Sequence, residues 1–154
     1  MTGQPVLVIE HDPTVQLILI DMLSHAGYDV RAAISMEDVR AILSRCRPAL
    51  AVISGGSRGT FATGWRMAQC IAAIDPALPR IMLTTNTAVL QEVGQTERGQ
   101  LFAAGLLKPF DLHELLATVA RHLRSSDGPA YTSLSRHVDS QAHDRSHEHK
   151  EKHV

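Results

Sequence analysis

The sequence PVLVIEHDP at residues 5–13 decides the fold of this chain. Its first five residues are apolar and rich in β-branched side chains, which is typical of a strand buried on both faces of a sheet. The run ends at Glu10, and Asp12 followed by Pro13 has the form of a helix N-cap with proline at the first helical position. Apolar residues then recur at helical spacing until Gly27, which is expected to end the helix. These apolar positions are Val15, Ile18, Leu19, Met22 and Leu23.

The same alternation of strand and helix continues as far as residue 124. Short apolar runs predict further strands at 28–33, 50–53, 81–84 and 105–107. A second helix is expected to begin at Ser35, with Asp38 three residues later as in a capping box. Helical patterns also predict helices at about 64–74, 89–93 and 111–123. The expected buried stripe of the last helix comprises Leu112, Leu115, Leu116, Val119 and Leu123. The pattern predicts an α/β fold, a doubly wound five-stranded parallel sheet flanked by about five helices.

Length and composition limit the function. Residues 5–124 are expected to form a single domain, long enough to bury a stable core. Residues 1–124 contain 11 Arg and Lys against 11 Asp and Glu, so no basic field for nucleic acid is expected. There is no apolar run of about 18 residues and no export signal, so we expect a cytoplasmic protein without a membrane span. Cys46 and Cys70 lack metal-ligand spacing and are interpreted as buried thiols.

Residues 125–154 differ in composition from the rest of the chain. They hold few aliphatic residues, several Ser and five His, and are interpreted as a polar, disordered tail. His143 and His147 are four residues apart, as are His149 and His153, which is the helical spacing of two-histidine metal sites. Because the segment is polar all round, no helix is assured. Metal binding by the tail stays an alternative to a solvated tail.

Four strand ends carry polar residues that are expected to meet. Doubly wound sheets bind ligands beyond the carboxyl ends of their strands, at the switch in strand order. Here those ends carry Glu10-His11, Ser54, Thr84 and Lys108. Lys108 is also the single lysine in the first 149 residues. The sequence therefore predicts a polar pocket that contains this lysine.

In order and spacing, these strand ends resemble the receiver domain of bacterial two-component response regulators. The resemblance covers residues 5–124, and its strongest part is GLLKPF at 105–110, a Lys-Pro dipeptide that ends the fifth strand before a capped helix. Its other parts are VIEHDP at 8–13, PALAVIS at 48–54 and IMLTT at 81–85. The resemblance implies the flavodoxin-like receiver fold and a cis peptide bond between Lys108 and Pro109.

In a working receiver, two acids at the end of strand one and an aspartate at the end of strand three hold Mg²⁺. That aspartate accepts a phosphoryl group from a kinase histidine. By the resemblance, Lys108 corresponds to the lysine that binds the phosphoryl oxygens, Thr84 to the hydroxyl that moves to meet them, and Glu10 to the first acid. The chain departs from the pattern where His11 takes the second acid position and Ser54 takes the phosphoacceptor position.

These departures predict that the chemistry of the family is lost. Mg²⁺ prefers carboxylate oxygens, and with Glu10 alone beside a lysine its binding is expected to be lost or very weak, so no metal site or other cofactor is expected. Ser54 needs an activating base, and the candidate, His11, has no recognisable third residue or oxyanion hole; no enzyme activity is expected. Asp12 is interpreted as a helix cap, with a surrogate metal ligand as the alternative. Gly105 stands where the resemblance implies an aromatic switch residue.

The pocket is then expected to have a structural role. Ser54 and His11 should hydrogen-bond Glu10 and Lys108, and Glu10 and Lys108 should form a buried ion pair. We expect an atypical receiver-like module that signals by phosphorylation-independent protein–protein interaction, with a histidine kinase or another signalling protein as partner. Homodimers through helix four, strand five and helix five are also expected, and no nucleic-acid or membrane partner. The alternatives are a receiver phosphorylated at an unconventional residue and a protein that binds metal through its tail.

Overall fold

The structure, a computed structural model, describes residues 3–55, 61–93 and 101–125. The described residues up to Arg124 belong to one compact unit. The histidines of the expected tail lie outside the described residues. Within the described ranges, no helix is both long enough and apolar enough to cross a membrane.

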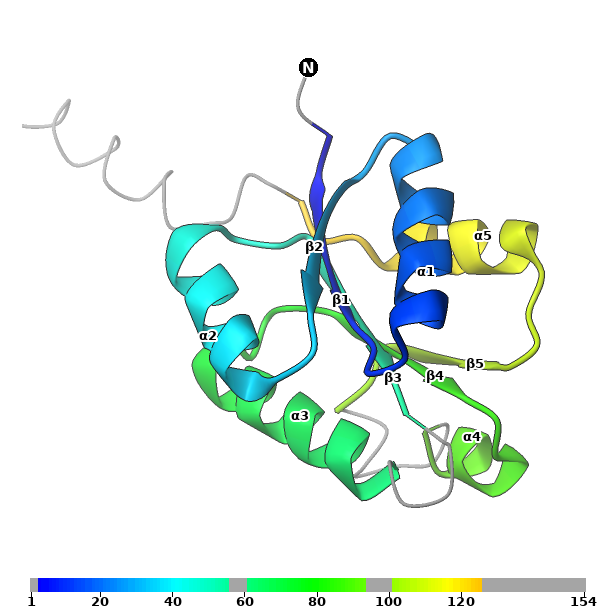
Figure 1. Ribbon diagram of the computed structural model, residues 1–154. Helices are drawn as coiled ribbons and strands as arrows, with labels where there is room; N and C mark the ends of the chain where they lie inside the picture. Colours follow the sequence, from blue (N-terminus) through cyan, green and yellow to red (C-terminus); the bar gives the residue numbers. More distant parts are fainter. Residues whose placement is uncertain (1–2, 56–60, 94–100, 126–154) are drawn as a thin grey trace, which may run out of the picture. The chain divides into compact units, whose positions relative to one another are not determined.

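Five parallel strands form one sheet in the order β2-β1-β3-β4-β5 (Figure 1). The strands are β1 (Pro5–Ile9), β2 (Asp29–Ala33), β3 (Leu50–Ser54), β4 (Arg80–Thr84) and β5 (Ala104–Leu107). The chain adds β2 on one side of β1 and the later strands on the other side, so the order reverses between β1 and β3. This is the predicted doubly wound α/β fold, and its switch point lies at the carboxyl ends of β1 and β3.

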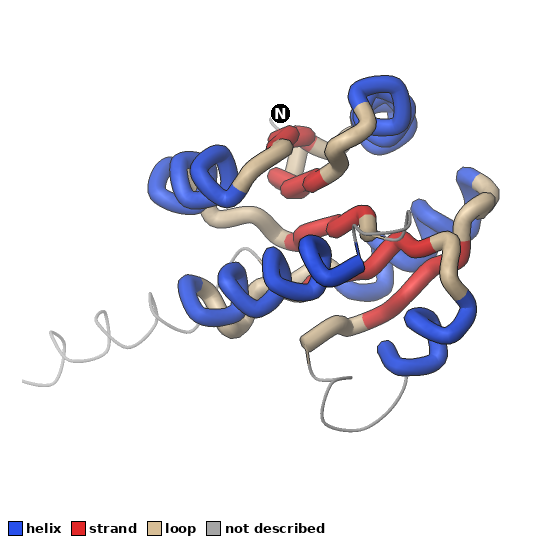
Figure 2. Tube along the Cα trace, turned by 60° about the horizontal axis from the view of Figure 1, so that its bottom comes forward, coloured by secondary structure: helices blue, strands red, loops and turns tan. Residues whose placement is uncertain are grey.

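The described residues contain five helices, which cover both faces of the sheet (Figures 1 and 2). They are α1 (Pro13–His25), α2 (Met36–Arg45), α3 (Phe61–Ile74), α4 (Thr87–Val93) and α5 (Leu112–His122). Successive residues of a strand point to opposite faces, so β1 contributes to two cores. Val6 and Val8 pack with residues of α1 and α5, whereas Leu7 and Ile9 pack with residues of α2 and α3. The continuous apolar runs of the central strands thus reflect burial on both faces.

Capping residues determine where the helices begin and end. Asp12 accepts hydrogen bonds from two backbone N–H groups in the first turn of α1, which begins at Pro13. Gly27 follows this helix with a φ of 94°, a conformation that glycine adopts without strain. Ser35 and Asp111 cap α2 and α5 in the same way as Asp12 caps α1. These caps were predicted from the sequence and are confirmed.

Some details of the predicted helices are wrong. Ile18 is 52% exposed, because its neighbour on α1, Leu19, occupies the side that packs on the sheet. Leu112 is 40% exposed at the first residue of α5, one turn before the buried Leu115. Helix α3 begins at Phe61, three residues before the predicted start.

The two cysteines are less buried than predicted. Cys46 and Cys70 are both half-buried free thiols. Cys46 follows the last residue of α2 as its C-cap, and Cys70 lies on α3 next to the buried Ile71 in the sequence.

Candidate functional site

Parallel pairing brings the ends of β1, β3, β4 and β5 to one edge of the sheet. The register places the last residues of neighbouring strands within one position of each other, so the side chains at and after these strand ends lie near one another. The edge carries the residues predicted for the pocket, namely Glu10, Ser54, Thr84 and Lys108. The first three are buried and the last is half-buried.

Lys108 contacts two of these residues directly. Its Nζ donates hydrogen bonds to Oγ of Ser54 and to Oε2 of Glu10, the latter at 3.2 Å. The hydroxyl of Ser54 is also hydrogen-bonded to the carboxylate of Glu10. The side chains of Lys108 and Glu10 are 23% and 9% exposed. The structure thus contains the expected ion pair, with Ser54 as a third member that accepts from the ammonium and donates to the acid.

Glu10 is a carboxylate at neutral pH. Burial on its own raises the pKa of Glu10, because it removes water from the charged form. Hydrogen bonds from the Ser54 hydroxyl and from the backbone N–H of Asp12, which lies 3.0 Å from Oε1, act in the opposite direction, as does the charge of Lys108. Their sum lowers the pKa of Glu10 below its ordinary value. A carboxylate with a lowered pKa is a weak general base.

The side chains of the other two residues of the expected acidic cluster, His11 and Asp12, are not among the described contacts of this network. His11 is exposed, and the hydrogen bonds described for Glu10, Ser54 and Lys108 do not include it. The prediction that His11 bonds within the pocket is therefore wrong. The cause is the turn from β1 into α1, in which the backbone N–H of Asp12 binds Glu10 while the Asp12 carboxylate caps the helix.

Two further residues hold this edge together and were missed by sequence reasoning. Gln16 of α1 donates through Nε2 to the carbonyl oxygens of Glu10 and Ala33, both at 3.3 Å, and so ties β1 to β2. Asn86 donates its N–H to Oγ1 of Thr84 at 3.1 Å, and its Oδ1 accepts an N–H of the first turn of α4 at 2.9 Å. An asparagine before a helical pattern is an N-cap signal that the sequence contains. Gln16 has no comparable signal.

Thr84 also lies at the carboxyl end of the sheet, but its hydroxyl contacts the segment that leads into α4. Its side chain is fully buried, and Oγ1 is engaged with the first residues that follow β4. Its carbonyl oxygen accepts the backbone N–H of Lys108 at 2.7 Å, which extends the pairing of β4 with β5 by one residue. The peptide bond between Lys108 and Pro109 is cis.

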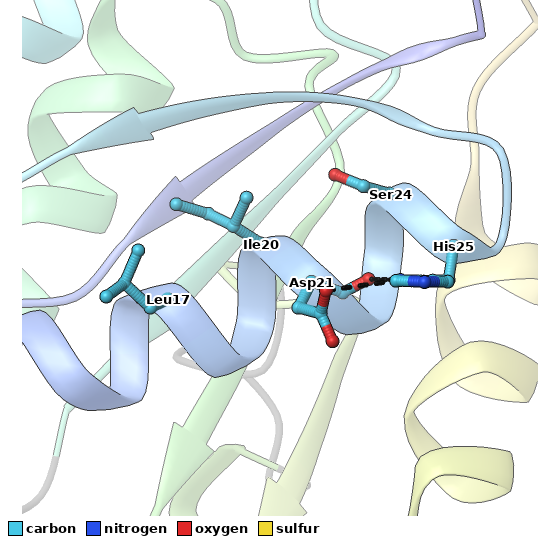
Figure 3. A pocket seen from close by; sticks show the side chains of 5 residues that line it. All are labelled: Leu17, Ile20, Asp21, Ser24 and His25. Atoms are coloured by element: carbon cyan, nitrogen blue, oxygen red, sulfur yellow. Dashed lines mark hydrogen bonds and ion pairs between the residues drawn. The ribbon is translucent and has the colours of Figure 1, made fainter.

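An open pocket lies elsewhere, along the outer side of α1 (Figure 3). The residues that line it all belong to this helix and are Leu17, Ile20, Asp21, Ser24 and His25. Nδ1 of His25 lies 3.2 Å from Oδ1 of Asp21, and both side chains are highly exposed. No residue of the pocket around Lys108 lines it, so it forms no part of the candidate site.

No family model matches the chain. The DNA-binding transcriptional regulator NtrC of Rhizobium meliloti (strain 1021) is 28% identical over 131 residues, which cover 80% of this chain and 25% of that relative. The chain therefore spans about a quarter of the length of the curated relative that it matches.

Solved structures of receiver domains superpose on the chain. The receiver domain of NtrX from Brucella abortus matches with a TM-score of 0.67 and 22% identity, over 79% of this chain and 99% of that one. The response regulator TrrA from Thermotoga maritima, solved in complex with Mg²⁺ and BeF, matches with a TM-score of 0.65 and 19% identity, over 78% and 99%. The chain has the receiver-domain fold of two-component response regulators.

Proposed function

We propose that this chain is an atypical receiver-like signalling module of the cytoplasm. In this proposal it acts by phosphorylation-independent protein–protein contacts in a two-component-type pathway and is not an enzyme. The receiver fold and the likeness to NtrC support the signalling class. The observation that carries the finer proposal is that Lys108 hydrogen-bonds both Ser54 and Glu10, contacts that it would have to leave in order to bind a phosphoryl group.

The donor set at this edge does not suit Mg²⁺. Mg²⁺ takes oxygen ligands at about 2.0–2.1 Å in near-octahedral geometry, with one or two carboxylates among them. Among the described residues that contact Ser54 or Lys108, Glu10 supplies the one carboxylate, and both of its oxygens already accept hydrogen bonds. An ion bound there would also meet the ammonium charge of Lys108. We therefore expect Mg²⁺ binding to be lost or very weak.

Ser54 is poorly placed to act as a nucleophile. A serine hydroxyl attacks only when a base takes its proton. The group that accepts its hydrogen bond, Glu10, has a lowered pKa, and the ammonium of Lys108 is directed at a lone pair of Oγ. Both contacts oppose attack on a phosphorus atom. We expect no stable phosphoryl group on Ser54.

Signalling would then depend on surface contacts. We propose a histidine kinase or another signalling protein as partner and a homodimer through α4, β5 and α5. Strand β5 is the last strand in the order of the sheet, and among the described residues no strand pairs with its outer side. The balanced charge of residues 1–124 argues against nucleic acid as the partner.

Phosphoryl transfer can be tested directly. The protein is incubated with acetyl phosphate and Mg²⁺, and its intact mass is recorded over time. We expect no adduct, whereas a stable mass increase of about 80 Da, one phosphoryl group, would refute phosphorylation independence and favour a receiver with an unconventional acceptor. Mapping of the modified peptide would then identify that acceptor.

The double variant His11→Asp, Ser54→Asp is the matched control for this experiment. It restores carboxylates at the two positions that depart from the receiver pattern, so it should bind Mg²⁺ and acquire the phosphoryl group if the scaffold is intact. A double variant that takes up phosphoryl beside an inert wild type would assign the loss to these two positions. If neither protein is modified, the assignment to these two positions is wrong.

A further inference from the structure

Strand β2 is the outermost strand on the side of the sheet away from β5, and β1 is its only partner among the described strands. Helices α1 and α2 lie on opposite faces of the sheet beside it (Figure 1). Val30 packs with residues of α1, whereas Ala33 packs with residues of α2. The outer side of β2 therefore has no described strand against it, and an open edge of this kind can pair with a strand of another chain.

The backbone groups that point outward at this edge belong to Val30 and Ala32. The N–H of Asp29 donates to the carbonyl oxygen of the residue before β1 at 3.0 Å, and the carbonyl oxygen of Ala33 accepts the N–H of Glu10 at 3.3 Å. Asp29 and Ala33 therefore direct their backbone groups towards β1. Alternate residues of a strand direct theirs to opposite sides, so Val30 and Ala32 direct theirs away from β1. Each of these two residues can donate and accept a hydrogen bond at the open edge.

The side chains along β2 carry one charge of each sign. Asp29 and Arg31 lie two residues apart, so both point to the face that Ala33 shares. Their side chains are 35% and 50% exposed, and Nη2 of Arg31 lies 2.7 Å from Oδ2 of Asp29. Val30, between them, is half-buried on the other face. The edge is therefore neutral in sum but charged in a fixed order, with the acid before Val30 and the base after it.

Apolar side chains of α1 lie next to the same edge. Leu17 is 66% exposed and lines the open pocket together with Ile20 (Figure 3). Gln16 reaches the end of β2 through its hydrogen bond to the carbonyl oxygen of Ala33. Ile20 follows Gln16 by four residues and so shares its side of the helix. The pocket is thus on the side of α1 that faces β2, and a neighbour at the open edge would cover its apolar lining.

We propose that β2 pairs in antiparallel fashion with β2 of a second copy of this chain, about a two-fold axis at Val30. At the axis, Val30 of each copy donates its outward N–H to the carbonyl oxygen of the other Val30. Asp29 then stands opposite Arg31 of the second copy, and Arg31 opposite Asp29, so the four charges alternate in sign around the axis. A parallel pairing, or an axis at Arg31, places like charges opposite one another and is disfavoured. The two sheets join into one, with both α1 pockets on the same face beside the axis.

Two opposite charge variants of the full chain test this pairing. Asp29→Arg leaves two positive charges on β2, and Arg31→Asp leaves two negative charges. Copies of either variant repel one another at the proposed axis, whereas a mixture of the two places opposite charges across from each other again. Sedimentation equilibrium of the wild type, each variant and the mixture gives the Kd of association, and thermal melts verify that each variant is folded.

Ala32→Pro is a third variant that acts through the backbone. It removes an outward N–H and leaves the N–H groups that pair with β1, and proline is tolerated at such a position of an edge strand. Its Kd should rise as much as that of the charge variants. Dimers through α4, β5 and α5 lie at the other edge of the sheet, so none of the three substitutions should weaken them.

We expect the wild type to form reversible dimers with a Kd below about 1 mM, since an edge contact is small. Each charge variant alone should raise this Kd at least about tenfold, and the mixture should return to within about threefold of the wild type. A wild type that stays monomeric up to about 1 mM would overturn the proposal. Dimers that none of the three substitutions weakens would overturn it too, as would a mixture that associates no better than its separate components.

Discussion

Replacing Lys108 by methionine removes the ammonium group from the pocket and keeps an unbranched side chain of similar length. Glu10 then loses the contact at 3.2 Å and retains the hydrogen bonds from Ser54 and from the N–H of Asp12. Removal of one partner from a fully buried ion pair costs about 3–5 kcal/mol. The Lys108 side chain is 23% exposed and Glu10 keeps two hydrogen bonds, so we expect a loss of about 2 kcal/mol in the free energy of unfolding.

The cost of Lys108→Met should depend on pH. In the wild type the pKa of Glu10 is lower in the folded than in the unfolded chain. Ionised Glu10 therefore stabilises the fold fully above its pKa in the unfolded chain, and this stabilisation is lost as the pH falls through its pKa in the folded chain. In the variant the charge of Lys108 no longer offsets the effect of burial, so the pKa of Glu10 rises. Protonation at low pH then relieves the variant of its unpaired charge. The difference in stability between the two proteins should therefore narrow between pH 7 and pH 4.

Urea denaturation measures this difference, and Trp65, the single tryptophan, reports it by fluorescence. Its ring packs edge-on against Phe102 with centroids 5.2 Å apart, so unfolding changes its surroundings. The double variant Glu10→Gln, Lys108→Met is the control, because a neutral amide needs no counter-charge. Equal stability of wild type and Lys108→Met at pH 7 would refute the reasoning. The reasoning would also be refuted if the double variant lost as much free energy of unfolding as the single variants Glu10→Gln and Lys108→Met lose together.

The remaining predictions concern other parts of the chain. Asp75→Asn should lower the free energy of unfolding by about 1–2 kcal/mol at pH 7, because it breaks the paired hydrogen bonds at 3.0 and 2.7 Å from Arg124. Arg124 lowers the pKa of Asp75, so this contribution is lost on acidification, and urea curves of wild type and variant should converge toward pH 3. Asp12→Ala should lower the free energy of unfolding by about 1 kcal/mol, because α1 loses its N-cap. Asp29→Ala, which removes an ion pair with Arg31 at the surface, is the control and should cost less than about half of that. Thermal melts of the two variants measure the difference. If the histidines of residues 125–154 bind metal, their replacement by alanine should abolish Ni²⁺ binding in a calorimetric titration; equal isotherms would remove this alternative.

The fold was predictable because its strands and caps have local causes. The runs at β1, β3 and β4 are continuously apolar since both of their faces are buried, and Asp12, Ser35 and Asp111 cap helices with their own side chains. Helix α4 was placed too late, at residue 89, because its short sequence carries little periodicity and the cap at Asn86 was overlooked. Tertiary packing decided the orientation of Ile18, which no local pattern distinguishes from its buried neighbour.

The candidate site was predictable in its members and only partly in its contacts. Parallel strands end at one edge, so the gathering of Glu10, Ser54 and Lys108 follows from topology alone. The direction of His11 depends on how the turn into α1 closes, which is a three-dimensional property of the backbone. The bridging role of Gln16 depends on two carbonyl groups from separate strands, and no sequence spacing encodes that meeting.

The structure also explains why the chain has a lysine at position 108, although every other Lys or Arg in its first 149 residues is an arginine. An ammonium is a compact charge whose three donors can reach different oxygens from one point, and Nζ bonds both Ser54 and Glu10. A guanidinium is planar and can donate two parallel hydrogen bonds to one carboxylate, as Arg124 does to Asp75. If Lys108 were lost while Glu10 stayed, the acid would be buried without a counter-charge. Retention of the lysine therefore follows from the electrostatics of Glu10 alone, and phosphoryl chemistry is not needed to account for it.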